Sequence, residues 1–498
     1  MRTSLLPLLI FVLSLAAIGQ STPHQLPNSK SYAAWLKPCE VASPEGAKEN
    51  ALCGKYEVFE NRSSRSGRKI PINVLVLPAT GKGKIREPLF YFAGGPGSAA
   101  TEEAPYIAED LPGVRTDRDL VFVDQRGTGG SNPLNCNFFD ASDPQSYLGH
   151  WNPPADVIRC RKELEPLADL TLYTTSIAMD DLDEIRSALG YQKIDLYGIS
   201  YGSRAAQEYV RRHEKNVRSI IIQGVSLTGQ FMPGDFPLAN EAALNGVLNE
   251  CLADTACRAA FPNIKTETRT VLETLRKGPK KVTIKIDGKT ADVLLSRDLA
   301  AEAIRYMLYR SASASSVPLY LNAAANGNYT PLASAAFLFR KEIVATGANG
   351  MYLSVTCAED LPFVDRAASL RNGENTFLGN YRLIQQSEAC ALWPRSPIPN
   401  GYSDPVRSKV PALIISGQWD PVTPSTAGDK ASKHLPNSTH VIVPSGGHSY
   451  GGLSGLECIT NIFNKFLSTA RPRSIDSSCV RSIRRTGFSL AFPKANEK

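Results

Sequence analysis

The stretch DLYGISYGSRAAQEY, residues 195–209, places a serine between two glycines at a change of hydrophobic pattern. Apolar residues alternate over 194–197, which is typical of a short buried strand, and then recur at helical spacing after the serine. Gly198 and Gly202 have no Cβ, so the strand and the helix can pass close together around a sharp turn. The pattern G-x-S-x-G predicts a nucleophile elbow that presents the hydroxyl of Ser200. The alternative is a serine that merely caps the helix.

Short apolar runs alternate with helical patterns in two blocks of the chain, which indicates βαβ units and a mostly parallel sheet with helices on both faces. The expected strands cover residues 72–78, 88–94, 120–125, 194–198, 219–224, 412–417 and 439–444. Between the blocks, helical patterns surround an Asp287-Gly288 pair that is typical of a hairpin turn. We therefore expect an α/β protein whose core comprises residues 20–225 and 409–498, with a mainly helical cap inserted as residues 226–408.

The N-terminal residues have the layout of a secretory signal peptide, which we expect to cover residues 1–19. Arg2 precedes an apolar run over 5–18, and Gly19 supplies a small residue for cleavage. A membrane anchor is the alternative, but the run is short for a bilayer span and contains Pro7. We expect a secreted or periplasmic protein without stable membrane association.

All ten cysteines lie after this segment, and their even number favours disulfides formed in an oxidising compartment. Sequence alone leaves the connectivity open, but proximity along the chain suggests five local pairs: Cys39 with Cys53, Cys136 with Cys160, Cys251 with Cys257, Cys357 with Cys390, and Cys458 with Cys479. The sequence contains no Cys-x-x-Cys pair and no Cys/His cluster, so we expect neither a metal nor a cofactor. The net charge of +7 is dispersed apart from a basic tail, so we expect no nucleic-acid partner.

Ser200 needs a base that takes its proton and a carboxylate that orients this base. Of the six histidines, His448 is the best candidate because it lies in the loop SGGHSYGG, directly after the expected strand 439–444. Loops at strand ends are where active-site residues gather on a parallel sheet. His440 opens that strand, which makes it a weaker candidate. The alternative for His448 is an ordinary surface-loop residue.

Asp420 is the best candidate for the orienting carboxylate. It follows the expected strand 412–417 in the segment QWDPVTP, whose prolines stiffen the turn, whereas Asp429 lies in a helical pattern. The order Ser200, Asp420, His448 is that of α/β hydrolases. We therefore predict these three residues as a catalytic triad, with capping of the next helix as the alternative role of Asp420.

Acyl transfer also needs donors for the oxyanion, and loss of one such donor typically costs about 3 kcal/mol. We expect one donor to be the backbone N–H of Tyr201, directly after the serine. The second should come from the earlier strand-end loop YFAGGPGS, where Gly94 and Gly95 permit a close backbone approach. A phosphate-binding loop is the alternative, but this loop lacks the lysine and the spacing of a P-loop.

Five segments carry these features in one order: AGGPGS (93–98), DQRGTGGSNPLNC (124–136), GISYGS (198–203), GQWDPVTP (417–424) and GGH (446–448). With them, the chain resembles the proline iminopeptidase and tripeptidyl aminopeptidase family of α/β-hydrolase serine exopeptidases. The resemblance implies the α/β-hydrolase fold, the same triad and oxyanion hole, and a helical cap that governs access. Ala93 stands where many proline iminopeptidases have a histidine, so the match leans towards the tripeptidyl-aminopeptidase-like branch.

These features predict a secreted serine exopeptidase that hydrolyses peptide bonds near the free N-terminus of short peptides through an acyl-enzyme on Ser200. Related exopeptidases are similar in binding the substrate ammonium with acidic cap residues. The stretch SVTCAEDLPF makes Glu359 and Asp360 the first candidates, and Glu241 or Glu302 could serve instead. A carboxylesterase acting on small esters is the competing function, because the fold does not decide between the two. A catalytically silent binding protein fits less well, since no binding role needs all three triad residues.

Overall fold

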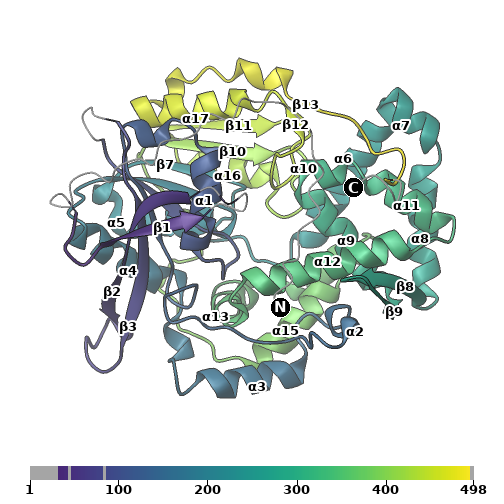
Figure 1. Cartoon of the computed structure of the whole chain (residues 1–498), viewed down its shortest axis with the longest axis horizontal. Helices are drawn as coiled ribbons and strands as arrows, with labels where there is room; N and C mark the ends of the chain where they lie inside the picture. The colour runs from purple at the N-terminus through teal and green to yellow at the C-terminus, as the bar shows by residue number, and fades with distance from the viewer. Residues whose placement is uncertain (1–31, 43–45, 47, 82–85, 494–498) are drawn as a thin grey trace.

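The computed structural model describes residues 32–42, 46, 48–81 and 86–493, and the expected signal peptide lies outside these residues. Figure 1 shows a sheet flanked by helices and, beside it, a second group of helices. Within the described ranges, no helix has the length and apolar composition needed to cross a membrane.

The core is a nine-stranded sheet in the order β1-β2-β3-β5-β4-β6-β7-β10-β11. Its strands are β1 (Lys37–Ala42), β2 (Lys48–Phe59), β3 (Lys69–Leu77), β4 (Leu89–Phe92), β5 (Leu120–Val123), β6 (Ile194–Ile199), β7 (Val217–Gln223), β10 (Ala412–Gly417) and β11 (Ser438–Val443). From β5 to β11 the neighbouring strands pair in parallel, whereas β1, β2 and β3 pair antiparallel. Every strand expected from the sequence forms, and β1 and β2 are additional.

Helices cover both faces of this sheet, which explains why its central strands are apolar throughout. In β5, Val121 and Val123 lie in one apolar cluster while Leu120 and Phe122 lie in another. The first cluster includes residues of α4 (Thr175–Ala188), α5 (Tyr201–His213) and α16 (Ser425–His434); the second includes residues of α1 (Ala100–Asp110) and α17 (Glu457–Thr469). Burial on both faces is typical of a parallel sheet, and the α/β-hydrolase fold predicted from the sequence is confirmed.

A third apolar cluster is built mainly from the chain between β7 and β10 (Figure 1). That chain forms α6 (Phe236–Ala253), α7 (Thr255–Ala260), α8 (Ile264–Arg276), β8 (Lys280–Ile286), β9 (Lys289–Leu295), α9 (Arg297–Tyr309), α10 (Ser311–Ala314), α11 (Val317–Ala325), α12 (Thr330–Thr346), α13 (Asn349–Glu359), α14 (Arg366–Gly373) and α15 (Tyr381–Leu392). Asp287 and Gly288 join β8 to β9 with positive φ values of 49° and 84°, as a tight hairpin requires.

The end of this inserted chain packs against the sheet. Met351 and Val355 of α13, with Ala389 of α15, belong to the same apolar cluster as one face of the sheet. Helices α13 and α15 therefore connect the cap to the core. The limits 226 and 408 that the sequence suggests for a separate cap stay a prediction.

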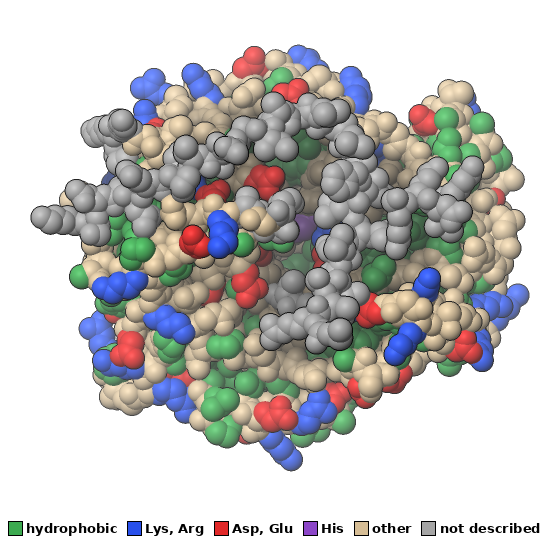
Figure 2. Space-filling model, in the orientation of Figure 1, with side chains coloured by type: hydrophobic (Ala, Val, Ile, Leu, Met, Phe, Trp, Pro, Cys, Tyr) green, Lys and Arg blue, Asp and Glu red, His purple; other side chains and the backbone are tan. Residues whose placement is uncertain are grey.

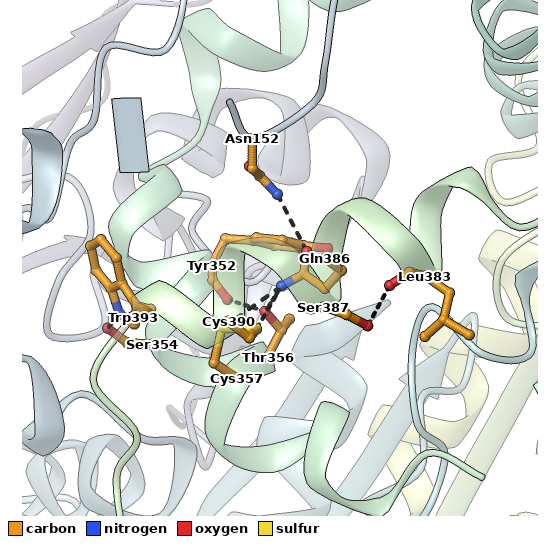
Figure 3. The surroundings of a disulfide bond; sticks show 10 residues. All are labelled: Asn152, Tyr352, Ser354, Thr356, Cys357, Leu383, Gln386, Ser387, Cys390 and Trp393. Carbon is orange, nitrogen blue, oxygen red and sulfur yellow. Dashed lines mark hydrogen bonds between the residues drawn. A yellow bond between two sulfur atoms is a disulfide. The ribbon is translucent and has the colours of Figure 1, made fainter. Parts of the chain in front are cut away.

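All five expected cysteine pairs form disulfides. The bond between Cys357 and Cys390 joins α13 to α15, and Figure 3 shows its surroundings. Gln386 donates a hydrogen bond of 2.8 Å to the Thr356 hydroxyl, and its Nε2 lies 3.3 Å from Cys390 Sγ. The indole of Trp393 donates to the Ser354 hydroxyl over 3.0 Å. The disulfide thus lies at the centre of a polar network that fixes α15 on α13.

Removal of this disulfide should destabilise the protein more than removal of a bond that closes a short loop. Cys357 and Cys390 are 33 residues apart, whereas Cys251 and Cys257 are 6 apart. Loop-closure entropy gives about 3 to 4 kcal/mol for the longer loop and about 2 kcal/mol for the shorter. Denaturant unfolding of the two double Cys→Ser variants measures both losses. Equal losses, or a larger loss at the shorter loop, would contradict this expectation.

Candidate active site

Ser200 lies on a sharp turn between β6 and α5. Its backbone has φ 59° and ψ −124°, a conformation that residues with a side chain rarely adopt and that clusters at functional sites. The flanking positions must be glycine because neighbouring backbone comes too close for a side chain. A Cβ on Gly198 would lie 2.2 Å from the Gly202 carbonyl oxygen, and one on Gly202 would lie 1.9 Å from the Phe92 carbonyl oxygen. The G-x-S-x-G segment therefore has the geometry of a nucleophile elbow.

The hydroxyl of Ser200 is not used to cap α5, because its side chain makes no capping hydrogen bond. The turn is held by its backbone instead. The Ser200 amide donates to the Gln223 carbonyl over 2.9 Å, and the Ser203 hydroxyl donates to the Ser200 carbonyl over 2.6 Å. Among the residues that the structure describes, none hydrogen-bonds to the hydroxyl of this half-buried serine, which leaves it available for chemistry.

Asp420 and His448 lie together, as an orienting carboxylate and a base must. His448 Nδ1 is 2.7 Å from Asp420 Oδ2. The other carboxylate oxygen of Asp420 accepts hydrogen bonds from the amides of Val422 (2.8 Å) and Thr423 (2.9 Å). Since Asp420 is buried and its oxygens are held by donors, it can keep the imidazole in one orientation.

Thr423 is a site residue that the sequence analysis missed. Its hydroxyl donates to Asp420 Oδ2 over 2.7 Å and lies 3.0 Å from His448 Nδ1, so it bridges both partners. A threonine three residues after an aspartate commonly closes a local turn on the carboxylate, and that spacing could have identified it.

The elbow and the histidine meet at the end of β7. The strands β6, β7, β10 and β11 are parallel neighbours, so their carboxyl ends share one edge of the sheet. Ser200 is hydrogen-bonded to Gln223, the last residue of β7. The next residue, Gly224, has φ 56°, and a Cβ there would lie 3.0 Å from His448 Cε1. His448 also contacts Tyr309, whose ring meets the imidazole edge-on with 5.3 Å between the ring centroids.

The backbone groups expected to bind the oxyanion surround the same serine. Tyr201 is the first residue of α5, so its amide is one of those with no acceptor inside the helix. A Cβ on Gly94 would lie 3.5 Å from Ser200 Cβ, which places this loop directly beside the elbow. Gly95 follows with φ 108°, a conformation suited to glycine. The oxyanion roles of Tyr201, Gly94 and Gly95 stay predictions.

A second Ser–His–Asp arrangement joins β10, β11 and α16, with its serine buried and its aspartate largely exposed. His440 Nε2 is 2.9 Å from the Ser416 hydroxyl, and His440 Nδ1 is 3.0 Å from Asp429 Oδ1. Ser416 lies within β10 with an exposed fraction of 0 %, so no substrate can reach it. Burial also lowers the pKa of His440, opposed by Asp429. This arrangement is structural, and it provides matched controls for the catalytic candidates.

Glu359 and Asp360, the predicted ligands of the substrate ammonium, are fully buried at the end of α13. Glu359 accepts 2.6 Å hydrogen bonds from the amide and the hydroxyl of Thr175, and also a hydrogen bond from Tyr402. Asp360 is paired with Arg204 of α5 at 2.8 Å. These contacts fix the end of α13 against α5, the helix that follows Ser200, and against the start of α4. The ammonium role of both residues stays a prediction. To bind a substrate ammonium, both carboxylates would have to give up these partners within the chain.

The two alternative carboxylates also have protein partners. Glu241 accepts a 2.8 Å hydrogen bond from the Phe377 amide, and Glu302 is paired with Arg305 at 3.1 Å. Glu302 is buried within the cap, whereas Glu241 is half-buried. In the described part of the chain, no group of three or more His, Cys, Asp or Glu residues could hold a metal ion.

The buried Asp360 should contribute a measurable pH dependence of stability. Burial raises the pKa of Asp360 from 3.8 to about 6, opposed by Arg204. A carboxyl whose pKa rises on folding stabilises the native state at low pH, and this stabilisation is lost as the pH rises through the folded-state pKa. We expect Asp360→Asn, which mimics the protonated carboxyl, to reduce the difference in Tm between about pH 5 and about pH 7.5. Identical pH dependence in both proteins would refute this contribution.

Two family models match the chain, one described as alpha/beta hydrolase fold over residues 87–282 and one described as TAP-like protein over residues 375–479. The chain is similar to the serine protease Hip1 of Mycobacterium tuberculosis, with 25% identity over 454 residues, 80% of this chain and 82% of that protein. It is 28% identical to the tripeptidyl aminopeptidase of Streptomyces coelicolor over 197 residues, 35% of each chain. Among solved structures, a proline iminopeptidase of Mycobacterium smegmatis has 18% identity and a TM-score of 0.39, covering 84% of this chain and 99% of that one.

Proposed function

We infer that this chain, which belongs to the proline iminopeptidase and tripeptidyl aminopeptidase family of α/β-hydrolases, is a serine exopeptidase that cleaves short peptides near their free N-terminus. The observation that carries the proposal is the Asp420–His448 pair beside the Ser200 elbow. The names of the relatives support a peptide substrate, and the five disulfides fit an oxidising compartment, secreted or periplasmic.

In the proposed mechanism, His448 is the general base. Its Nδ1 faces Asp420, so Nε2 is the nitrogen available to take the proton of the Ser200 hydroxyl. The serine oxygen then attacks the peptide carbonyl, and Asp420 stabilises the imidazolium that forms. Thr423 satisfies the same Asp420 oxygen and limits its movement.

The negative charge on the carbonyl oxygen would be stabilised by the amides of Tyr201 and of Gly94 or Gly95. Fixed backbone donors are effective here because they need no reorganisation during the reaction. His448 then returns the proton to the leaving amine, and an acyl-enzyme on Ser200 remains. A water molecule, deprotonated by His448, hydrolyses this ester and restores the serine.

Selection for a free N-terminus requires negative charge near the acyl side of the site, because a desolvated ammonium needs a paired charge. In the face that Figure 2 shows, acidic side chains lie beside the hollowed centre. This distribution suits a cationic N-terminus entering the cap.

The test is digestion of matched peptides with free and N-acetylated amino termini, followed by mass spectrometry of the products. We expect release of short N-terminal fragments from the free peptides. Acetylation removes the charge and should lower kcat/KM roughly 100-fold or more, the effect of losing one partner of a buried ion pair. A Ser200→Ala preparation serves as the control for contaminating peptidases.

Two outcomes would refute the proposal. Equal cleavage of acetylated and free peptides would identify an endopeptidase. Hydrolysis of p-nitrophenyl butyrate without cleavage of any peptide would identify the competing function, a carboxylesterase of small esters.

A further inference from the structure

Three arginines and one glutamate are buried together in the cap. Buried charged side chains are normally paired with charges of opposite sign. Arg305 comes from α9, Arg340 from α12 and Arg382 from α15, with exposed fractions of 2 %, 2 % and 7 %. Glu302, also on α9, is the carboxylate that pairs with two of them. Buried charges are costly unless they are paired, so a surplus of positive charge here points to an anion that is not part of the chain.

The hydrogen bonds of the cluster leave donors unused. Arg305 binds Glu302 at 3.1 Å and donates to the Tyr309 hydroxyl over 2.5 Å. Arg340 donates to the His150 carbonyl over 3.1 Å. Within the described residues, Arg305 Nε, Arg340 Nε and Arg382 Nη1 are buried without a hydrogen-bond partner.

Of the three arginines, Arg382 is the least engaged in ion pairs and hydrogen bonds. Its Nη1 lies 3.7 Å from the Glu302 carboxylate, beyond hydrogen-bond distance. Its guanidinium stacks on Trp151 at 4.2 Å from the ring centroid, and Arg340 lies over the same ring at 4.0 Å. Stacking on an aromatic ring stabilises a guanidinium but leaves the N–H groups in its plane available.

The cluster adjoins the catalytic candidates through one side chain. Tyr309 accepts the hydrogen bond from Arg305, and its ring contacts the His448 ring. The Tyr309 carbonyl also accepts the Ser449 amide over 2.9 Å, which fixes the loop that carries His448. Tyr309 therefore separates the guanidinium groups from His448 by a single side chain.

The position of Arg382 is rigid. Its helix α15 is joined to α13 by the Cys357–Cys390 disulfide, beside Gln386 in Figure 3. Trp151 is held on α15 because its amide donates to the Gln385 side chain over 2.8 Å. A pre-formed guanidinium on a fixed aromatic ring suits bidentate binding of a planar anion. Burial lowers the pKa of Arg340 to about 10, whereas the pKa values of Arg305 and Arg382 are raised because the nearby Tyr309 and Glu302 outweigh their burial.

We propose that Arg382, with Arg305 and Arg340, binds a carboxylate of the substrate and makes the enzyme selective for anionic short peptides. The carboxylate is either the C-terminus of the peptide or an Asp or Glu side chain. The inference rests on the proposed exopeptidase function and adds to it a second anchor, which binds negative charge.

Wild-type enzyme tests this inference directly. One arm compares short peptides with a free C-terminal carboxylate and with a C-terminal amide; the other compares Glu with Gln at each position. We expect a kcat/KM preference of about 10-fold or more for the anionic member of one arm, the effect of a lost charged hydrogen bond. The arm that responds identifies the source of the carboxylate. Preferences within about 2-fold in both arms would overturn the proposal.

Arg382→Gln should abolish that preference, mainly through KM. Arg371→Gln, at an exposed arginine of the neighbouring helix α14, is the matched control and should keep it. Removing one cation from a surplus should leave Tm unchanged or raise it. A preference that survives in Arg382→Gln, or a lower Tm with an unchanged preference, would mean a purely structural cluster. If Arg382→Gln does not fold, Arg382→Lys decides: it keeps the charge but loses the planar fork, so an unchanged preference would contradict the proposal.

A pair of esters separates this inference from the proposed function. The p-nitrophenyl half-ester of adipic acid carries a remote carboxylate, and p-nitrophenyl hexanoate does not. If no peptide is cleaved, the exopeptidase proposal fails, and this pair still tests the anion site. Faster hydrolysis of the anionic ester, lost in Arg382→Gln, supports the site, whereas equal rates overturn it.

Discussion

Replacement of Ser200 by alanine should lower the turnover of peptides by about a million-fold. The expected loss is this large because the hydroxyl forms the covalent intermediate, and no other group can replace it. The fold should remain intact, since the side chain does not cap α5 and the turn is held by backbone hydrogen bonds. Steady-state and single-turnover kinetics of the purified variant measure the loss, and circular dichroism and Tm monitor the fold.

The matched control is Ser416→Ala. Ser416 is hydrogen-bonded to His440, which is itself paired with Asp429, but it is buried within β10. We expect this variant to lose some stability and to keep its kcat. Activity near that of the wild type in Ser200→Ala, or a comparable loss of kcat in Ser416→Ala, would mean that the catalytic serine has been misassigned.

Asp420→Asn should lower kcat on the order of ten-thousand-fold. An asparagine of the same shape can present its NH₂ group to His448 Nδ1, which favours the tautomer whose Nε2 carries a proton and cannot act as a base. The negative charge that stabilises the imidazolium is lost as well. Because the Val422 and Thr423 amides can still bind the side-chain oxygen, the loop should keep its shape. The kcat and Tm of the purified variant test both expectations.

Asp429→Asn is the control for this change, because Asp429 pairs with His440 at 3.0 Å in the structural arrangement. Its turnover should match that of the wild type. A loss of less than about ten-fold in Asp420→Asn would show that His448 does not depend on this carboxylate for orientation.

The strands of the sheet could be predicted because most of them are buried on both faces and read as continuous apolar runs. All four residues of β4 and of β5 are buried, and so are all six of β10. β1 and β2 were missed because they are partly exposed and contain several charged residues, as in KENALCGKYEVF. Their place beside β3 depends on pairing across the sheet, which leaves little local pattern in the sequence.

The triad candidates could be found because each lies at the end of a strand, in a short motif with glycine or proline. Glu359 and Asp360 were predicted to bind the substrate ammonium, a role that stays a prediction, and the structure shows both carboxylates buried with partners from the chain itself. What the sequence could not give is the partner of each, since Thr175, Tyr402 and Arg204 are distant along the chain.

The arginine cluster was also missed, for the same reason. It is assembled from three helices, α9, α12 and α15, whose packing brings the charges together. On each helix by itself, an arginine is an ordinary polar residue. Clusters built by tertiary packing have no local pattern in the sequence, and only their spatial arrangement reveals a surplus of charge.

The central claim is that Ser200 is the nucleophile, and it is tested most directly by covalent labelling with a fluorophosphonate. Such probes react with serines activated by a neighbouring base. We predict one adduct per chain, located on Ser200 by peptide mapping and mass spectrometry, and no adduct in Ser200→Ala. Labelling of another residue, or labelling that persists in Ser200→Ala, would contradict the account.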